Sequence, residues 1–115
     1  MGFFSKSAPE LNAEGLTALG RGNFEQAVAL FDKACVKSPN EGTIWFNLGY
    51  AHVKRGNNQL AVVAFERSVN LGGPMVEQAR QWLEAINNPP KSTFKWEKVI
   101  GTAIGAVVLG ALGLG

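Results

Sequence analysis

The sequence predicts an all-α protein: an α-solenoid of two helical hairpins and a capping helix, followed by a C-terminal transmembrane helix. Three observations lead to this fold class. They are a repeat with a period of 34 residues, apolar residues at helical spacing within each period, and an uncharged apolar run at the C-terminal end. Repeats of this length are single supersecondary units that bury their apolar faces only against their neighbours. We therefore expect a linear array of helices.

The repeat appears when the sequence is aligned with itself after a shift of one period. RGNFEQAVALFDKA begins at Arg21, and RGNNQLAVVAFERS begins at Arg55. Identical residues occupy seven positions: Gly15/Gly49, Arg21/Arg55, Gly22/Gly56, Asn23/Asn57, Ala27/Ala61, Val28/Val62 and Phe31/Phe65. We predict a first repeat over residues 8–41 and a second over residues 42–75, after an N-terminal arm of residues 1–7.

Each repeat has the pattern of two helices joined by a tight turn. Gly56 can adopt the positive φ of a helix C-cap, and Asn57 can cap the helix that follows. Gly22 and Asn23 are placed to do the same in the first repeat. Both repeats are therefore predicted to be helical hairpins.

Small residues occupy the predicted crossing of the two helices in each hairpin, and Phe31 and Phe65 are expected to fill the space between neighbouring hairpins. This pattern resembles the tetratricopeptide repeat. The second repeat meets its signature with Trp45, Leu48, Gly49, Ala61 and Phe65, and it has Ser68 in the last alanine position. The first repeat supplies Leu11, Gly15, Ala27, Phe31, Ala34 and Pro39. The resemblance covers about residues 8–75.

Residues 74–87 are predicted to form one further helix, beginning at Pro74. Its apolar stripe consists of Met75, Ala79, Trp82, Leu83 and Ile86. Pro89 and Pro90 stand where the glycine turn of a third hairpin should come. We therefore expect a single capping helix that covers the end of the array.

Charge and composition exclude several classes of protein. Residues 1–87 carry eight Lys or Arg and eight Asp or Glu, so the net charge of +2 comes from residues 88–98. This neutrality argues against a nucleic-acid partner. A single cysteine allows no internal disulfide, and the first ten residues lack a secretory signal. We therefore expect the N-terminal domain to be cytosolic.

No motif in the sequence indicates an enzyme, a cofactor or a metal site. The chain has one His and one Cys, and it has no paired carboxylates and no phosphate-binding loop. His52, which replaces the usual Tyr of the repeat, is expected to be a hydrogen-bonded histidine between helices. Cys35 is expected to be a small core residue.

The resemblance implies a groove lined by the first helix of each repeat, with a protein partner bound in it. The implied groove positions are Asn12, Leu16, Leu19, Thr43, Phe46, Asn47, Tyr50, Val53, Lys54, Glu77, Arg80, Gln81 and Glu84. Chaperone-binding members grip a C-terminal carboxylate with several Lys, Arg and Asn, and only Asn47 fits that pattern. The apolar members of the set favour an amphipathic helix or an extended apolar segment. Alternatively the protein itself covers them, for example with Phe3 and Phe4.

Residues 88–98 read as a linker and a juxtamembrane collar, and residues 99–115 as a transmembrane tail. Aromatic and basic side chains typical of the cytoplasmic membrane interface are Phe94, Lys95, Trp96 and Lys98. The 17 residues of the tail span about 25 Å as a helix, slightly less than the roughly 30 Å of a hydrocarbon core. The sequence thus predicts a single C-terminal anchor in a membrane that it does not identify.

Small residues give the tail a face on which a second transmembrane helix could pack. These residues are Gly101, Gly105, Ala106 and Gly110. The second helix would come from another copy of the chain or from a partner. The alternative is that the tail covers the repeats, or docks into another subunit, in solution.

Together these patterns favour a membrane-anchored adaptor or assembly factor that presents a small groove to other proteins at the cytosolic face. An accessory subunit, with its tail fixed among the transmembrane helices of a complex, is the alternative. A soluble co-chaperone is a weaker third, because the carboxylate-binding pattern is missing.

Overall fold

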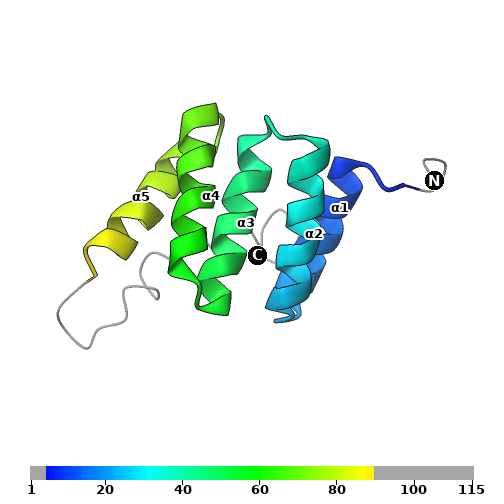
Figure 1. Ribbon diagram of the computed structural model, residues 1–115, viewed down its shortest axis with the longest axis horizontal. Helices are drawn as coiled ribbons and strands as arrows, with labels where there is room; N and C mark the ends of the chain where they lie inside the picture. The colour runs from blue at the N-terminus through cyan, green and yellow to red at the C-terminus, as the bar shows by residue number, and fades with distance from the viewer. Residues whose placement is uncertain (1–4, 90–115) are drawn as a thin grey trace.

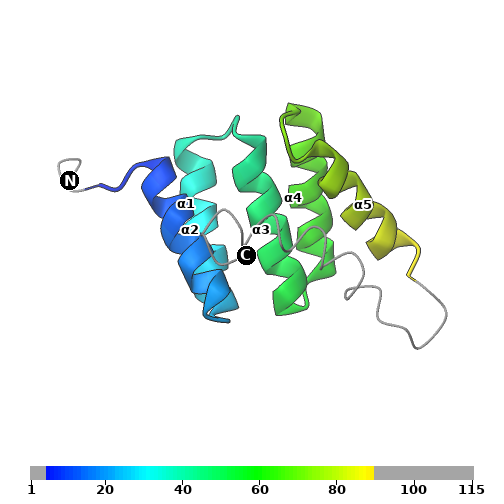
Figure 2. The same cartoon turned by 180° about the vertical axis from the view of Figure 1, so that it is seen from behind.

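A computed structural model describes residues 5–89, which form five α-helices in two layers. The helices are α1 (Ala8–Gly20), α2 (Phe24–Lys37), α3 (Gly42–Arg55), α4 (Asn58–Leu71) and α5 (Val76–Asn87). The layer of α2 and α4 faces the viewer in Figure 1, and the layer of α1, α3 and α5 faces the viewer in Figure 2. Each helix packs against the next along the chain, and α1 also contacts α3. The predicted all-α arrangement of two hairpins and a fifth helix is confirmed.

The predicted membrane-interface residues and transmembrane tail lie outside the described residues. Within residues 5–89, none of the helices is both long and apolar enough to cross a membrane.

The turn inside each hairpin is built in the same way twice. Gly22 has φ of 80° and Gly56 has φ of 86°, in the left-handed region that favours glycine. The N–H of Asn23 donates to the carbonyl oxygen of Ala18 over 2.9 Å, and that of Asn57 donates to His52 over 2.8 Å. These bonds satisfy carbonyl groups at the helix end in the manner of a Schellman motif.

The same two asparagines also begin the next helix. The side-chain oxygen of Asn23 accepts from the N–H of Gln26, and that of Asn57 accepts from the N–H of Leu60. One Gly-Asn pair therefore ends one helix and starts another, which explains why this dipeptide recurs after one period.

Gly15 and Gly49 each support the ring of a phenylalanine from the other helix of the same hairpin. A Cβ at Gly15 would lie 2.5 Å from Cε1 of Phe31, and a Cβ at Gly49 would lie 2.7 Å from Cδ1 of Phe65. Both rings are completely buried. The sequence placed these rings between neighbouring hairpins, whereas the structure shows that they also close each hairpin internally.

Ser68, the departure from alanine, ties α4 to the start of α3. Its hydroxyl donates to the carbonyl oxygen of Gly42 over 2.8 Å in a buried position. Gly42 itself is close to the end of α4, since a Cβ there would lie 2.5 Å from the carbonyl oxygen of Gly72. The polar side chain is tolerated in the core because its hydrogen bond is made.

The capping helix α5 begins at Val76, two residues later than predicted, because Pro74 lies in the preceding turn. Its Trp82 is completely buried. The Trp82 ring stacks on Phe65 with a centroid separation of 6.0 Å and meets Tyr50 edge-on at 5.8 Å. The helix therefore continues the aromatic core of the second hairpin.

Gly49→Ala should destabilise the protein although alanine favours helix. The added Cβ displaces the Phe65 ring, and overpacking of this kind costs about 1–3 kcal/mol against a propensity gain of about 1 kcal/mol. Denaturant unfolding followed by circular dichroism measures the change. In a chain that also carries Phe65→Leu, Gly49→Ala should lower the free energy of unfolding by less than it does in the natural chain. Equal losses of stability in the two chains would contradict the proposed contact.

Candidate functional site

The helices α1, α3 and α5 form one surface, called here the inner face, and the predicted groove residues lie on these helices. Nδ2 of Asn47 on α3 donates to Oδ1 of Asn12 on α1 over 3.0 Å. Tyr50 on α3 meets Trp82 on α5 through the edge-on ring contact. Residues from three different helices are thus in contact, although Trp82 is not one of the predicted groove positions.

Most of the apolar groove positions are buried in the structure. The buried groove residues are Leu16, Leu19, Phe46, Asn47, Tyr50 and Val53, each less than a tenth exposed. The half-buried ones are Asn12, Thr43 and Lys54, and the exposed ones are Glu77, Arg80, Gln81 and Glu84. The predicted set therefore divides into a buried, largely apolar floor and a polar, accessible rim.

Two of the buried residues have structural partners that the sequence did not indicate. The ring of Phe46 lies 5.4 Å from that of Phe65, so it belongs to the core between α3 and α4. Asn47, the one residue that fitted carboxylate binding, uses its amide to bind Asn12. This use of the amide gives a further reason against capture of a C-terminal carboxylate.

The charged residues of the rim make local contacts. Nζ of Lys54 lies 5.8 Å from the ring centroid of Phe24, at the junction of α3 and α2. Nη1 of Arg80 lies 3.4 Å from Oε2 of Glu77, one turn earlier on α5. Both are exposed or half-exposed contacts worth little energy, so a partner can rearrange these side chains at low cost.

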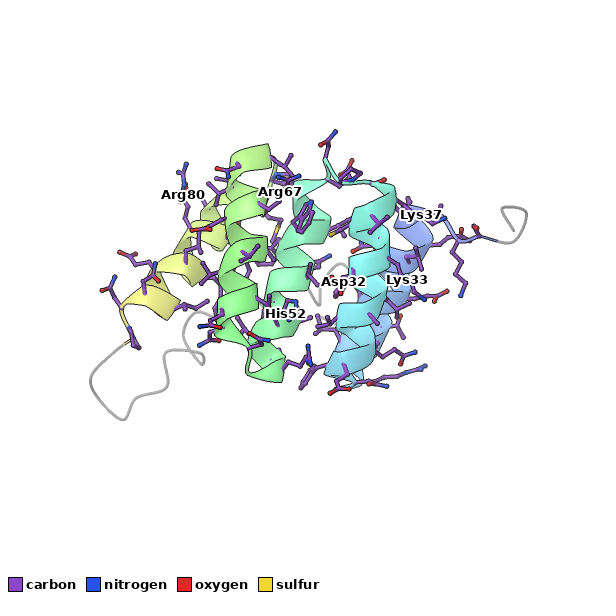
Figure 3. The ribbon with its side chains drawn as sticks, in the orientation of Figure 1. Asp32, Lys33, Lys37, His52, Arg67 and Arg80 are labelled. Atoms are coloured by element: carbon purple, nitrogen blue, oxygen red, sulfur yellow. The ribbon has the colours of Figure 1, made fainter. Side chains whose placement is uncertain are left out.

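A second site, which the sequence did not reveal, lies on the other side of the molecule, between α2, α3 and α4. It is a hollow of about 360 Å³ in which Asp32, His52 and Arg55 lie together with the exposed apolar residues Leu60 and Val63. Figure 3 shows Asp32 on α2 and His52 on the adjacent helix α3. The residues come from three helices with no common motif, so only packing brings them together.

Burial dominates the electrostatics of this hollow. It lowers the pKa of His52, an effect that Asp32 opposes and Arg55 reinforces. Burial also raises the pKa of Asp32, against the influence of His52 and Arg55. Nδ1 of His52 is buried and has no hydrogen-bond partner among the described residues. The expected hydrogen bond of His52 is therefore not made at Nδ1 by any residue between 5 and 89.

Cys35, which does not line this hollow, has a buried thiol. Burial, followed by the charge of Asp32, raises the pKa of the buried Cys35 thiol to about 12, so the thiol stays protonated at neutral pH and is a poor nucleophile. No group of three or more His, Cys, Asp or Glu within residues 5–89 is placed to hold a metal ion. Cys35 is a core residue, as predicted.

Acid should destabilise the protein through His52 as the pH falls below the ordinary histidine value of about 6.5. The pKa of His52 is lowered in the folded state, so the unfolded chain binds a proton at this imidazole more readily than the folded chain does. The stabilisation is therefore complete above the ordinary histidine pKa and is lost as the pH falls below it. Melting temperatures at about pH 7.5 and about pH 5.5 measure the effect. Because the chain has one histidine, His52→Gln should flatten the dependence, and an unchanged slope would refute the assignment.

Comparisons with known proteins agree with this geometry. The model of the tetratricopeptide repeat family matches residues 12–73, which is more than half of the chain. No curated protein and no solved structure matched in the corresponding comparisons. The matched region runs from within α1 to the turn after α4, so it contains both Gly-Asn turns and both glycine–phenylalanine contacts. The chain therefore belongs to the tetratricopeptide repeat family.

Proposed function

We propose that the protein is a non-enzymatic adaptor or assembly factor, anchored in a membrane by residues 99–115, that binds a protein partner on its inner face. Repeats of this family are protein-interaction modules. The observation that carries the proposal is the joining of α1, α3 and α5 into one surface through the Asn12–Asn47 and Tyr50–Trp82 contacts. A continuous face of this kind suits an elongated segment of another protein.

The burial of the floor decides how such a partner binds. Accessible contacts on the inner face come from the polar rim, so the partner supplies polar or charged groups to it. An apolar residue of the partner can contact the floor only where no rim side chain covers it. We therefore expect an amphipathic segment, whose polar side chains meet Arg80 and Gln81, and not a purely apolar one.

Membrane attachment is supported by the sequence after α5. Pro89 and Pro90 end the helical region, aromatic and basic residues follow, and the uncharged run completes the pattern of a C-terminal anchor. The small-residue face of the run favours packing against another transmembrane helix. The repeats would then stand at the cytosolic side of the membrane.

Carbonate extraction of membranes from cells that express the full chain tests the anchor. The full chain should stay in the pellet, whereas deletion of residues 94–115 should release it, because the deletion removes the apolar run and its interfacial residues. Release of the full chain by carbonate, or an unchanged distribution after the deletion, would reject membrane insertion.

Charge reversal on α5 tests the inner face. Arg80→Glu combined with Gln81→Glu should reduce co-purification of the partner at least tenfold, because both side chains are exposed on the predicted rim. A tenfold loss corresponds to about 1.4 kcal/mol of binding free energy. The matched control is Arg67→Glu with Asn70→Glu, which makes the same change in charge on exposed positions of α4. Quantitative mass spectrometry after affinity purification compares the two.

Equal loss in both variants would show an unspecific charge effect. Full retention by the α5 variant would place the partner elsewhere. Partners that depend only on residues 94–115, in fixed stoichiometry, would favour the accessory-subunit alternative.

A further inference from the structure

The end of the array at α1 carries a depression that the proposed function does not use. It has a volume of about 520 Å³ and lies between α1 and α2. Leu11, Leu30 and Val36 contribute its apolar surface, and Lys33 and Lys37 lie beside Val36 on α2. Val36 is 81% exposed, more than any other large hydrophobic residue that the structure describes. A group that covered this depression would remove the exposed Val36 side chain from water.

The two ends of the array differ in how they are closed. At one end, α5 covers the second hairpin and buries Trp82 completely. At the other, no described helix precedes α1. End repeats of a solenoid need a covering element because each repeat buries its apolar surface only against a neighbour. The depression is the part of the first hairpin that has no such neighbour among residues 5–89.

The chain itself leads directly to the depression. Ser5 and Lys6 are among its lining residues, and Lys6 forms an ion pair with Glu14 on α1. The N–H of Ser7 donates to Oε1 of Glu10 over 2.9 Å, and the Ser7 hydroxyl oxygen accepts from the N–H of Glu10 over 3.3 Å. This capping box, with the ion pair beside it, fixes the direction in which the chain enters α1.

Phe3 and Phe4 immediately precede Ser5 in the sequence. Consecutive Cα atoms are about 3.8 Å apart, so the Cα atoms of both phenylalanines lie within about 8 Å of that of Ser5. Because Ser5 already lines the depression, both rings can reach it. A segment tethered this closely has an effective concentration in the millimolar range, which favours even a weak contact.

We propose that Phe3 and Phe4 bind in the depression between α1 and α2, so that the N-terminal arm closes the first end of the array as α5 closes the last. The rings bury the exposed Val36 and the half-buried Leu30. The lysines at the edge gain aromatic faces as neighbours, an arrangement favourable for cations. None of the predicted groove residues lines this depression. The arm therefore leaves the inner face open, in contrast to the alternative in which Phe3 and Phe4 cover the groove.

Disulfide formation in the full chain tests the position of the arm. Phe4→Cys and Val36→Cys are combined with Cys35→Ala, which removes the natural thiol, and the protein is oxidised mildly at low concentration. An intramolecular disulfide is expected, because such a bond needs Cα atoms about 4.4–6.8 Å apart. The matched control pairs Phe4→Cys with Val63→Cys, which is 58% exposed on α4, and it should stay reduced. Mass spectrometry of the digested protein distinguishes the products.

Thermal unfolding provides the second measurement. Phe3→Ser with Phe4→Ser should lower the melting temperature by about 4 °C or more, whereas Phe3→Leu with Phe4→Leu should largely preserve it. Val36→Ser should lower the melting temperature less in the chain with Phe3→Ser and Phe4→Ser than in the natural chain, because the contact with the phenylalanine rings is already lost there. Val63→Ser, the control on α4, should have equal effects in both backgrounds.

Three outcomes would overturn the proposal. One is that the cysteine at position 4 forms a disulfide equally with a cysteine at position 36 and with one at position 63. Another is that Val36→Ser lowers the melting temperature by the same amount with and without Phe3 and Phe4. The third is a disulfide that forms mainly between chains, which would assign the depression to a second copy. Partner capture on the inner face is measured separately, so loss of the arm contact and failure of the proposed function are distinguishable.

Discussion

The contact between a glycine on one helix and a phenylalanine ring on the next sets the geometry of both hairpins. At Gly15 and Gly49 the ring of Phe31 or Phe65 occupies the space that any Cβ would need. The two helices of a hairpin can therefore approach until the ring lies directly on the backbone. The ring of Phe65 also stacks on that of Trp82. The position of α5 thus depends on the same contact.

This close packing has a consequence for the inner face. Apolar side chains at the predicted groove positions pack in the core, as Phe46 does through its contact with Phe65. The positions that carry apolar residues are therefore mainly structural, and the polar residues around them stay accessible. The five short helices of residues 5–89 leave little interior to spare, because a small domain buries a smaller fraction of its surface than a large one.

Two buried polar residues, one on α3 and one on α4, show how polar groups are accommodated in such a thin core. Ser68 is buried with its hydrogen bond made, whereas His52 is buried with Nδ1 lacking a described partner. The first arrangement holds α3 and α4 together without an electrostatic penalty. The second favours the neutral imidazole, and so couples stability to pH at a position where the family usually has tyrosine. Two departures from one repeat pattern therefore have different physical effects.

The sequence by itself determined the helices, their order and their pairing into hairpins. Period, helical spacing and the Gly-Asn turns are local properties, and the structure reproduces them with a shift of two residues at Pro74. The repeat also indicated that the first helix of each hairpin lies on one side of the array, and α1, α3 and α5 do share one layer.

Only the tertiary structure decided which side chains are accessible and which polar groups meet. Residues from different helices meet in three places: the buried rings of Phe46 and Tyr50, the hydrogen bond from Asn47 to Asn12, and the hollow around Asp32 and His52. No spacing along the chain encodes these contacts, because they follow from how the helices pack. Sequence periodicity therefore defines the array, and side-chain packing decides which of its surfaces remain available to another molecule.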